Sequence, residues 1–277
     1  AGVSGKDLAF VLLTHGHEDH DGGLSEIVQA TRVSVKAHKL YDRLIRLYPD
    51  DAPPGVDKDF PASCWRCLMP ASFSNKQCRA YHRERSRLEI ETIGDGETPI
   101  MNAVTSYHLP GHSPDALVFL LGEEVLLVGD TLLPDISPHP TRQSDFGQVA
   151  HVFGPAYPCG DSIYGLRAYL RSLKKLERIG TRMDHLIVLP GHRLFYNHRW
   201  NEMAVNERVR ELLTHHVERC GSILESLKQS PKTARELAVA YFEAPLLKGA
   251  GIIMAENEIF SHCELLQACG DVAASDN

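Results

Sequence analysis

A short stretch near the start of the chain, THGHEDH at residues 14–20, concentrates side chains that bind metal ions. It offers four potential ligands: His15, His17, Asp19 and His20. Imidazole nitrogens and carboxylate oxygens are ligands of Zn²⁺ and of other divalent first-row metals. With 15 histidines among 277 residues, the spacing H-x-H-x-x-H arises by chance at roughly one position in six thousand. The stretch therefore predicts a metal site, provided that the rest of the chain supplies the remaining ligands.

Three later segments share one form: a run typical of a buried strand, then a glycine, then a side chain that can bind a metal. They are YHLPGHSPD, EVLLVGDTLL and LIVLPGHRLF, which offer His112, Asp130 and His192. Glycine allows a tight turn and a close approach of the backbone to a shared centre. Strands that are neighbours in one sheet bring such ends together. Four segments of this kind in one chain argue against incidental structural histidines, and together they supply seven candidate ligands.

The elements that must position these side chains alternate between strands and helices. We expect strands at residues 7–13, 88–93, 102–109, 116–121, 124–129 and 185–191. We expect helices at residues 24–30, 43–48, 164–179 and 206–229. Thr233 and Glu236 have the spacing of a capping box before another short helix. The pattern predicts an α/β catalytic domain over residues 1–203 and a small helical, winged-helix-like domain over residues 204–277.

The seven candidate ligands resemble, in order and spacing, those of the metallo-β-lactamase superfamily. THGHEDH matches the signature of that family position by position, and PGH at both later histidines is similar to its glyoxalase II-like branch. The resemblance covers about residues 8–200 and implies an αββα sandwich with a two-metal cleft at one edge. The C-terminal region is similar to a branch with a winged-helix tail, which includes thioesterase-like hydrolases and an endoribonuclease. Members usually carry further strands before the signature, so we expect part of the first sheet to be missing from this chain.

The resemblance also implies how the ligands divide between two metal ions. One metal would be held by His15, His17 and His112, the second by Asp19, His20 and His192, with Asp130 as the bridge. A donor set without thiolate suits Zn²⁺, with Fe or Mn as alternatives. Two metals roughly 3.5–4 Å apart can share a hydroxide whose pKa falls toward ~7. Asp19 is the natural acceptor of its proton, so Asp19 and Asp130 are the expected catalytic carboxylates.

The leading interpretation is a dinuclear metal-dependent hydrolase whose metal-bridged hydroxide attacks a small ester, thioester or lactone. One alternative is a metal-dependent endoribonuclease or phosphodiesterase of the same superfamily, against which a net charge of −7 argues. Another is a mononuclear-iron persulfide dioxygenase, against which the complete second ligand set argues. His17 also favours hydrolysis, because the oxygen-reducing di-iron members carry an acid at that position.

Three side chains near the ligands are candidates for substrate binding: His139 and Arg142 in SPHPTR, and Tyr196 in HRLFYNHR. The competing interpretations are a solvated loop for the first two and a half-buried structural residue for the tyrosine. A second cluster, Cys64, Cys67, Cys78 and His82, has a spacing compatible with a structural zinc site. Separately packed, reduced cysteines are the interpretation that we favour for it.

Composition narrows the class of protein further. No apolar run approaches the ~20 residues that cross a bilayer. Seven scattered cysteines in a chain of this length indicate a reduced, cytoplasmic protein rather than a disulfide scaffold. We therefore expect a small-molecule substrate as partner, not nucleic acid or a membrane, and a homodimer as a further expectation.

Overall fold

The computed structural model of the chain describes residues 4–46, 81, 83–100, 103–183, 185–249 and 251–275. Its strands are β1 (Phe10–Leu12), β2 (Ser34–His38), β3 (Ile90–Ile93), β4 (Val104–His108), β5 (Leu117–Leu121), β6 (Val125–Gly129), β7 (Ile187–Pro190), β8 (Phe195–Tyr196) and β9 (Arg199–Trp200). Its α-helices are α1 (Glu18–Asp21), α2 (Leu24–Thr31), α3 (Lys39–Ile45), α5 (Phe146–Phe153), α6 (Gly165–Thr181), α7 (Val205–Gln229), α8 (Ala234–Tyr241) and α9 (Gly251–Cys269). Short 3₁₀ turns are η1 (Gly5–Asp7), η5 (Gln143–Asp145) and η6 (Ala244–Leu247).

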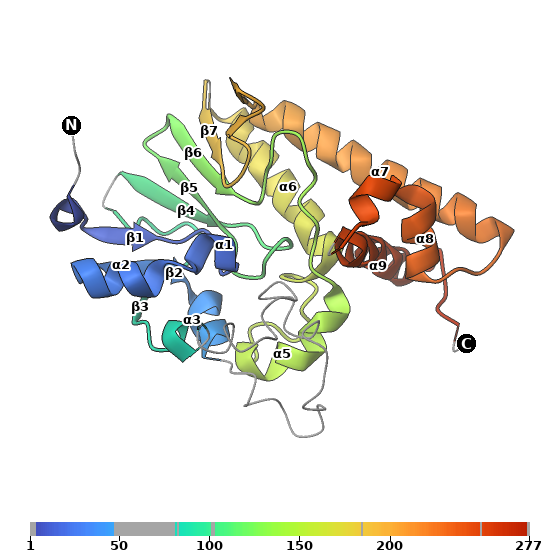
Figure 1. Ribbon diagram of the computed structural model, residues 1–277, viewed down its shortest axis with the longest axis horizontal. Coiled ribbons are helices and arrows are strands. Elements are labelled where there is room, and N and C mark those ends of the chain that lie inside the picture. The colour runs from blue at the N-terminus through green and yellow to red at the C-terminus, as the bar shows by residue number, and fades with distance from the viewer. Residues whose placement is uncertain are drawn as a thin grey trace.

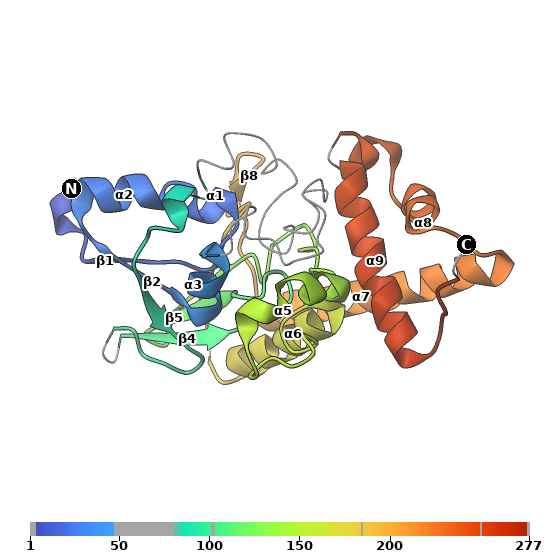
Figure 2. The same ribbon diagram turned by 90° about the horizontal axis from the view of Figure 1, so that it is seen from below.

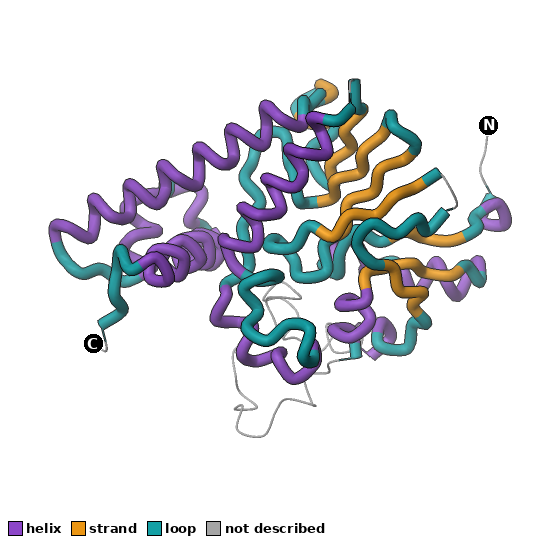
Figure 3. Tube along the Cα trace, turned by 180° about the vertical axis from the view of Figure 1, so that it is seen from behind, coloured by secondary structure: helices purple, strands orange, loops and turns teal. Residues whose placement is uncertain are grey.

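Two sheets form the centre of the molecule (Figure 1). The first has three parallel strands in the order β1-β2-β3. The second has the order β4-β5-β6-β7, in which only β6 and β7 run parallel. Helices α2 and α3 lie beside the first sheet, and α6 and α7 cover the second sheet, as the view from behind also shows (Figure 3). The αββα sandwich implied by the resemblance is confirmed.

Three apolar clusters hold these elements together, and strand β5 contributes side chains to two of them. Successive side chains of a strand point to opposite faces of its sheet. Leu117 and Phe119 join the cluster that also contains Ile93 of the first sheet, whereas Val118 and Leu120 join the cluster under α6 and α7. A third cluster fills the space between the first sheet and its helices. The run ALVFLL is apolar throughout because this strand is buried on both faces.

The predicted strands and helices are present, although the helix expected at residues 43–48 begins at Lys39 as α3, and the structure adds strands β2, β8 and β9 and helix α5. The helix expected at residues 164–179 is α6, and the apolar stripe of its sequence faces the core: Leu166, Tyr169, Leu173 and Leu176 are at most 1% exposed, and Leu170 is partly buried. Strand β2 was not predicted, although it is the centre of the first sheet. Its five residues bury only two apolar side chains, so its signal in the sequence is weak.

The C-terminal region consists of helices. The first half of α7 packs on the second sheet, and its second half forms a separate cluster with α8 and α9. These two helices lie at the opposite end of the molecule from α2 (Figure 2). The capping box of Thr233 and Glu236 is confirmed at the start of α8. No strand occurs within the described part of residues 204–275, and the domain boundary after residue 203 stays a prediction.

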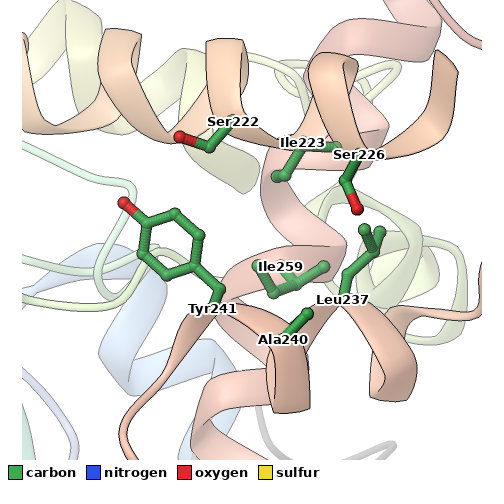
Figure 4. Close-up of a pocket in the computed structure, with 7 residues that line it drawn as sticks. All are labelled: Ser222, Ile223, Ser226, Leu237, Ala240, Tyr241 and Ile259. Carbon is green, nitrogen blue, oxygen red and sulfur yellow. The ribbon is translucent and has the colours of Figure 1, made fainter. Parts of the chain in front are cut away.

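A pocket of about 260 Å³ opens between α7, α8 and α9 (Figure 4). Apolar side chains such as Ile223, Leu237 and Ile259 line it, with the ring of Tyr241 at its side. None of the seven candidate ligands lines this pocket. Among the described helices, none has both the length and the apolar composition of a membrane span.

Candidate metal centre

The histidine-rich stretch leaves the first sheet at the end of β1 and crosses toward the second. The N–H of Leu13 donates to the main-chain oxygen of Lys36 in β2 at 3.0 Å. The N–H of Leu117 in β5 donates to the oxygen of Thr14 at 2.8 Å. His15 and His17 follow in a turn, and Asp19 and His20 lie in the short helix α1. The stretch is therefore attached to both sheets at the point where its ligands begin.

The three later ligands come from the ends of strands in the second sheet. His112 lies in the turn after β4, Asp130 directly follows β6, and His192 follows β7. Strands β6 and β7 are parallel neighbours, and the N–H of Gly191 donates to the oxygen of Gly129 at 2.8 Å. This pairing carries Asp130 and His192 to one edge of the sheet, as the strand–glycine–ligand pattern predicts.

All seven candidate ligands meet at that edge. Within the described residues, three overlapping groups could each hold a metal ion, and in each group the ligand atoms lie within 4.8 Å of one another. The groups are His15, His17 and His112; His15, His20 and Asp130; and Asp19, His20 and His192. The first and third groups have the same members as the two ligand sets that the resemblance implies.

Asp130 stands between the two outer groups. Its Oδ2 lies 3.6 Å from Nε2 of His112 and 3.3 Å from Nε2 of His192. Its Oδ1 lies 3.5 Å from Nε2 of His20. One carboxylate thus contacts histidines of both sets, which is the placement that a bridging ligand requires.

The buried polar atoms at this edge fit divalent cations. Nε2 of His20, Nε2 of His112 and Oδ1 of Asp130 are buried and make no hydrogen bond within the described structure. Buried polar atoms without a partner are costly, so such atoms in one place indicate a ligand. The close approach of Gly191 points the same way, because a Cβ there would stand 2.4 Å from Oδ1 of Asp130. A larger residue would displace the ligands.

Burial and neighbouring charges set the protonation of the cluster. Burial, with the adjacent histidines, holds the pKa of His15 and of His17 well below the ordinary value. Burial alone would lower the pKa of His20, but the carboxylates of Asp130 and Asp19 outweigh it and raise that pKa. Burial would raise the pKa of Asp130, yet His20 and the other histidines hold it at about 2. The neutral His15 and His17 and the ionised Asp130 are in the forms that bind metals, and His20 would have to give up its proton to a bound cation.

The loop that carries His139 and Arg142 supports the cluster from outside. Nδ1 of His112 donates to the main-chain oxygen of His139 at 3.0 Å. The guanidinium of Arg142 pairs with Asp145 at 2.7 Å and lies 5.3 Å from the ring of Phe260 in α9. The ring of His139 also lies 5.4 Å from the ring of His112, edge to face, whereas no described contact joins the side chain of Arg142 to the seven candidate ligands.

The third proposed substrate residue, Tyr196, lies on β8 and is 41% exposed. Its ring stacks against the guanidinium of Arg193 at 4.5 Å. Tyr196 follows the ligand His192 closely in sequence, but no described contact joins it to the cluster. Its role in substrate binding stays a prediction.

Two supporting carboxylates were missed by sequence reasoning. Glu264 in α9 accepts hydrogen bonds from the N–H groups of Gln143 and Ser144, at 2.7 and 3.0 Å, and so holds the loop of His139. Asp21 directly follows His20 and pairs with the buried Arg85. The position of Asp21 next to a candidate ligand could have indicated its supporting role from the sequence. No motif near Glu264 in the sequence indicates a contact with the site.

The cluster of Cys64, Cys67, Cys78 and His82 lies outside the described residues. Separately packed cysteines, which we favour, and a structural zinc site both stay untested.

Sequence comparison gives two matches. Residues 1–192 match the family model of the metallo-beta-lactamase superfamily. Over 133 residues the chain is 31% identical to the atrochrysone carboxyl ACP thioesterase of Passalora fulva. That match covers 47% of this chain and only 28% of the thioesterase.

Two solved structures have a similar fold. A metallo-beta-lactamase family protein from Thermus thermophilus superposes with a TM-score of 0.64 at 25% identity, over 99% of this chain and 79% of its own. A beta-lactamase domain protein from Burkholderia ambifaria superposes with a TM-score of 0.66 at 19% identity, over 98% of this chain and 72% of its own. Since the family model also matches most of the chain, this protein belongs to the metallo-beta-lactamase superfamily, whose members are mostly metal-dependent hydrolases.

Proposed function

We propose that this protein is a dinuclear metal-dependent hydrolase of small thioesters, esters or lactones. The observation that carries the proposal is the convergence of seven side chains into three overlapping ligand groups. Thioesters are the first class to test, because the partial match in Passalora fulva is named a thioesterase. Zn²⁺ is the metal that we expect, since the donors are imidazoles and carboxylates without thiolate.

Each ligand group has a distinct part in this proposal. One cation would be held by His15, His17 and His112, and the other by Asp19, His20 and His192. Asp130 would be the ligand shared by both, and the histidines around it hold its pKa at about 2, so it is ionised at neutral pH. When bound, two divalent cations polarise a carbonyl oxygen and lower the pKa of water.

Exposure distinguishes the two carboxylates. The side chain of Asp19 is 54% exposed, whereas that of Asp130 is 8% exposed. Oδ2 of Asp19 lies 3.0 Å from Nε2 of His192, at the rim of the cluster. We assign Asp19 as the group that orients the attacking water and accepts its proton, because solvent and substrate reach it. The buried Asp130 balances the charge of the centre.

Metal analysis joined to a substrate panel tests the proposal. We expect two equivalents of metal per chain and hydrolysis of a thioester, followed as thiol release, with no uptake of oxygen. A phenyl ester, a lactone and a short RNA complete the panel. If the protein cleaves the RNA and none of the other substrates, it is a nuclease and the proposal is wrong. If the protein binds one iron per chain and takes up oxygen with a persulfide, it is a persulfide dioxygenase and the proposal is wrong.

A pair of histidine variants controls for general damage. His17→Ala removes a proposed ligand, whereas His151→Ala removes an exposed histidine from α5. We expect the first to lose metal and activity and the second to keep both. Equal metal content in the two variants would contradict the ligand assignment.

The homodimer and the cytoplasmic location belong to the proposal as well. Light scattering of the purified protein measures the first, and fractionation of the source cells measures the second.

A further inference from the structure

A buried cation, Arg85, lies behind the candidate metal centre. Its side chain is 2% exposed, and it precedes β3 in the chain. One nitrogen, Nη1, pairs with Oδ2 of Asp21 at 2.7 Å and donates to the main-chain oxygen of Gly16 at 3.1 Å. The rings of Tyr81 and Tyr41 lie 4.9 and 5.9 Å from the guanidinium. The group is enclosed on several sides by aromatic and polar partners.

Nη1 of Arg85 also donates to the hydroxyl of Tyr81 at 3.0 Å, and its other two polar partners belong to the ligand stretch. Gly16 is the residue between His15 and His17, so the peptide that Arg85 holds links two candidate ligands. Asp21 directly follows His20 in α1. Arg85 therefore contacts this stretch at two places, each next to a ligand.

The surroundings leave this arrangement little freedom. Oδ2 of Asp21 also accepts a hydrogen bond from the hydroxyl of Tyr41 at 2.9 Å. A Cβ on Gly16 would stand 2.7 Å from Cδ2 of Tyr41, so only glycine fits against that ring. The peptide of Gly16 is thus packed on one aromatic ring and held by one guanidinium. Because Asp21 neutralises the guanidinium, the support adds no net charge beside the proposed cations.

We propose that Arg85 is a positioning residue for the metal centre. It fixes the peptide between His15 and His17 and, through Asp21, the turn of α1 that carries Asp19 and His20. Its effect is on the geometry of the ligands and not on the reacting atoms. The inference rests on the metal centre proposed above, and it adds the residue that holds the ligand stretch, residues 14–20, in place.

The chain contains a matched control for a purely structural role. Arg219 is also buried, at 4% exposure, and its Nη1 pairs with Oε1 of Glu258 at 2.7 Å. The rings of Tyr241 and Phe242 lie 3.9 and 4.6 Å from its guanidinium. This pair joins α7 to α9 and contacts none of the seven candidate ligands. It resembles the Arg85 pair in burial, distance and aromatic packing, but not in location.

The test compares Arg85→Met/Asp21→Asn with Arg219→Met/Glu258→Gln. Each double variant removes both charges, so neither leaves a single charge buried without its partner. Metal-free protein is titrated with Zn²⁺ and with Co²⁺, whose visible spectrum reports ligand geometry, at a temperature where thermal melts show both variants folded. We expect the first variant to bind metal about 10–100-fold more weakly and to shift the Co²⁺ spectrum. We expect the second to match the wild type in both readouts.

A conservative variant keeps the test decisive if the double variant does not fold. Arg85→Lys retains the charge but not the planar group, so we expect an intermediate loss of affinity with a shifted Co²⁺ spectrum. Wild-type affinity and spectrum in the folded Arg85 variants would overturn the positioning role. Equal losses in the Arg219 variant would overturn it too, because they would show an effect of stability alone. A wild-type protein that binds no metal would instead contradict the proposed function.

Discussion

The imidazole of His112 donates its Nδ1 hydrogen to the main-chain oxygen of His139 across 3.0 Å. A carbonyl oxygen can only accept, so this bond fixes the tautomer of His112 and leaves the lone pair on Nε2. That nitrogen faces Oδ2 of Asp130 at 3.6 Å. The loop behind His139 is in turn held by Glu264 in α9. The C-terminal helices thus reach the candidate metal centre through one loop.

Glu264→Ala should loosen that loop. The variant removes a carboxylate that accepts from two consecutive N–H groups at the start of η5. We expect the free energy of unfolding to fall by about 1 kcal/mol and metal affinity to fall less than tenfold, measured by urea unfolding and Zn²⁺ titration. Glu225→Ala, on the exposed face of α7, is the control and should change neither. Equal behaviour of the two variants would argue that the loop does not depend on α9.

Gly191→Ala should disrupt the centre with little effect on the rest of the fold. The new Cβ would stand 2.4 Å from Oδ1 of Asp130 and 2.8 Å from Cε1 of His20. We expect loss of bound metal and a fall in hydrolysis of at least ~100-fold, with an unchanged circular dichroism spectrum. Gly221→Ala in α7 meets nothing within 4 Å and should stabilise the protein by about 0.5–1 kcal/mol. Full metal content in Gly191→Ala would show that metal binding does not need the close approach of this backbone to Asp130.

Asp130→Asn keeps the shape of the side chain and removes its charge. Because Asp130 contacts histidines of both outer groups, we expect metal content to fall below two equivalents and hydrolysis to fall at least ~100-fold. Asp135→Asn is the control, since Asp135 lies in the same loop as Asp130, pairs with Arg193 after β7 and is no candidate ligand. Elemental analysis and thiol-release assays measure both variants. An Asp130→Asn protein that holds two metals would rule out the bridging role.

A histidine pair between α7 and α9 should contribute to a loss of stability between pH 6.5 and pH 4. Nδ1 of His262 donates to the main-chain oxygen of Glu258, and Nδ1 of His216 donates to Nε2 of His262 at 3.0 Å. Burial lowers the pKa of His216 to about 3 and that of His262 to about 4. The groups that face the pair are His215, Arg219, the Glu258 carboxylate and Tyr169.

The direction of this pH effect follows from the number of protons that the folded and unfolded states bind. The unfolded chain protonates each histidine near pH 6.5, whereas the folded protein keeps both neutral, so the unfolded state gains protons first as the pH falls. Each histidine then removes about 1.4 kcal/mol of stability per pH unit. His216→Gln/His262→Gln should flatten the curve of unfolding free energy against pH, and His151→Gln should not. Parallel curves for wild type and the double variant would contradict this prediction.

The seven candidate ligands could be predicted from the sequence, because metal chemistry restricts the residue types and the turns that present them. Imidazoles and carboxylates after strand–glycine junctions are a local pattern, and the structure brings all seven together. The buried stripe of α6 and the capping box of α8 were equally clear, since their signals lie within a few residues of each other.

The groups that contact the candidate ligands from behind could be identified only from the tertiary structure. Arg85 and Asp21 are 64 residues apart, and Glu264 and Gln143 are 121 residues apart. A main-chain oxygen or N–H group accepts any suitable partner that reaches it, so no residue type or spacing marks the partner beforehand. Whether a charged side chain is buried depends on the elements packed around it. The candidate ligands therefore follow from local chemistry, whereas the residues that contact them from behind follow from packing between distant segments.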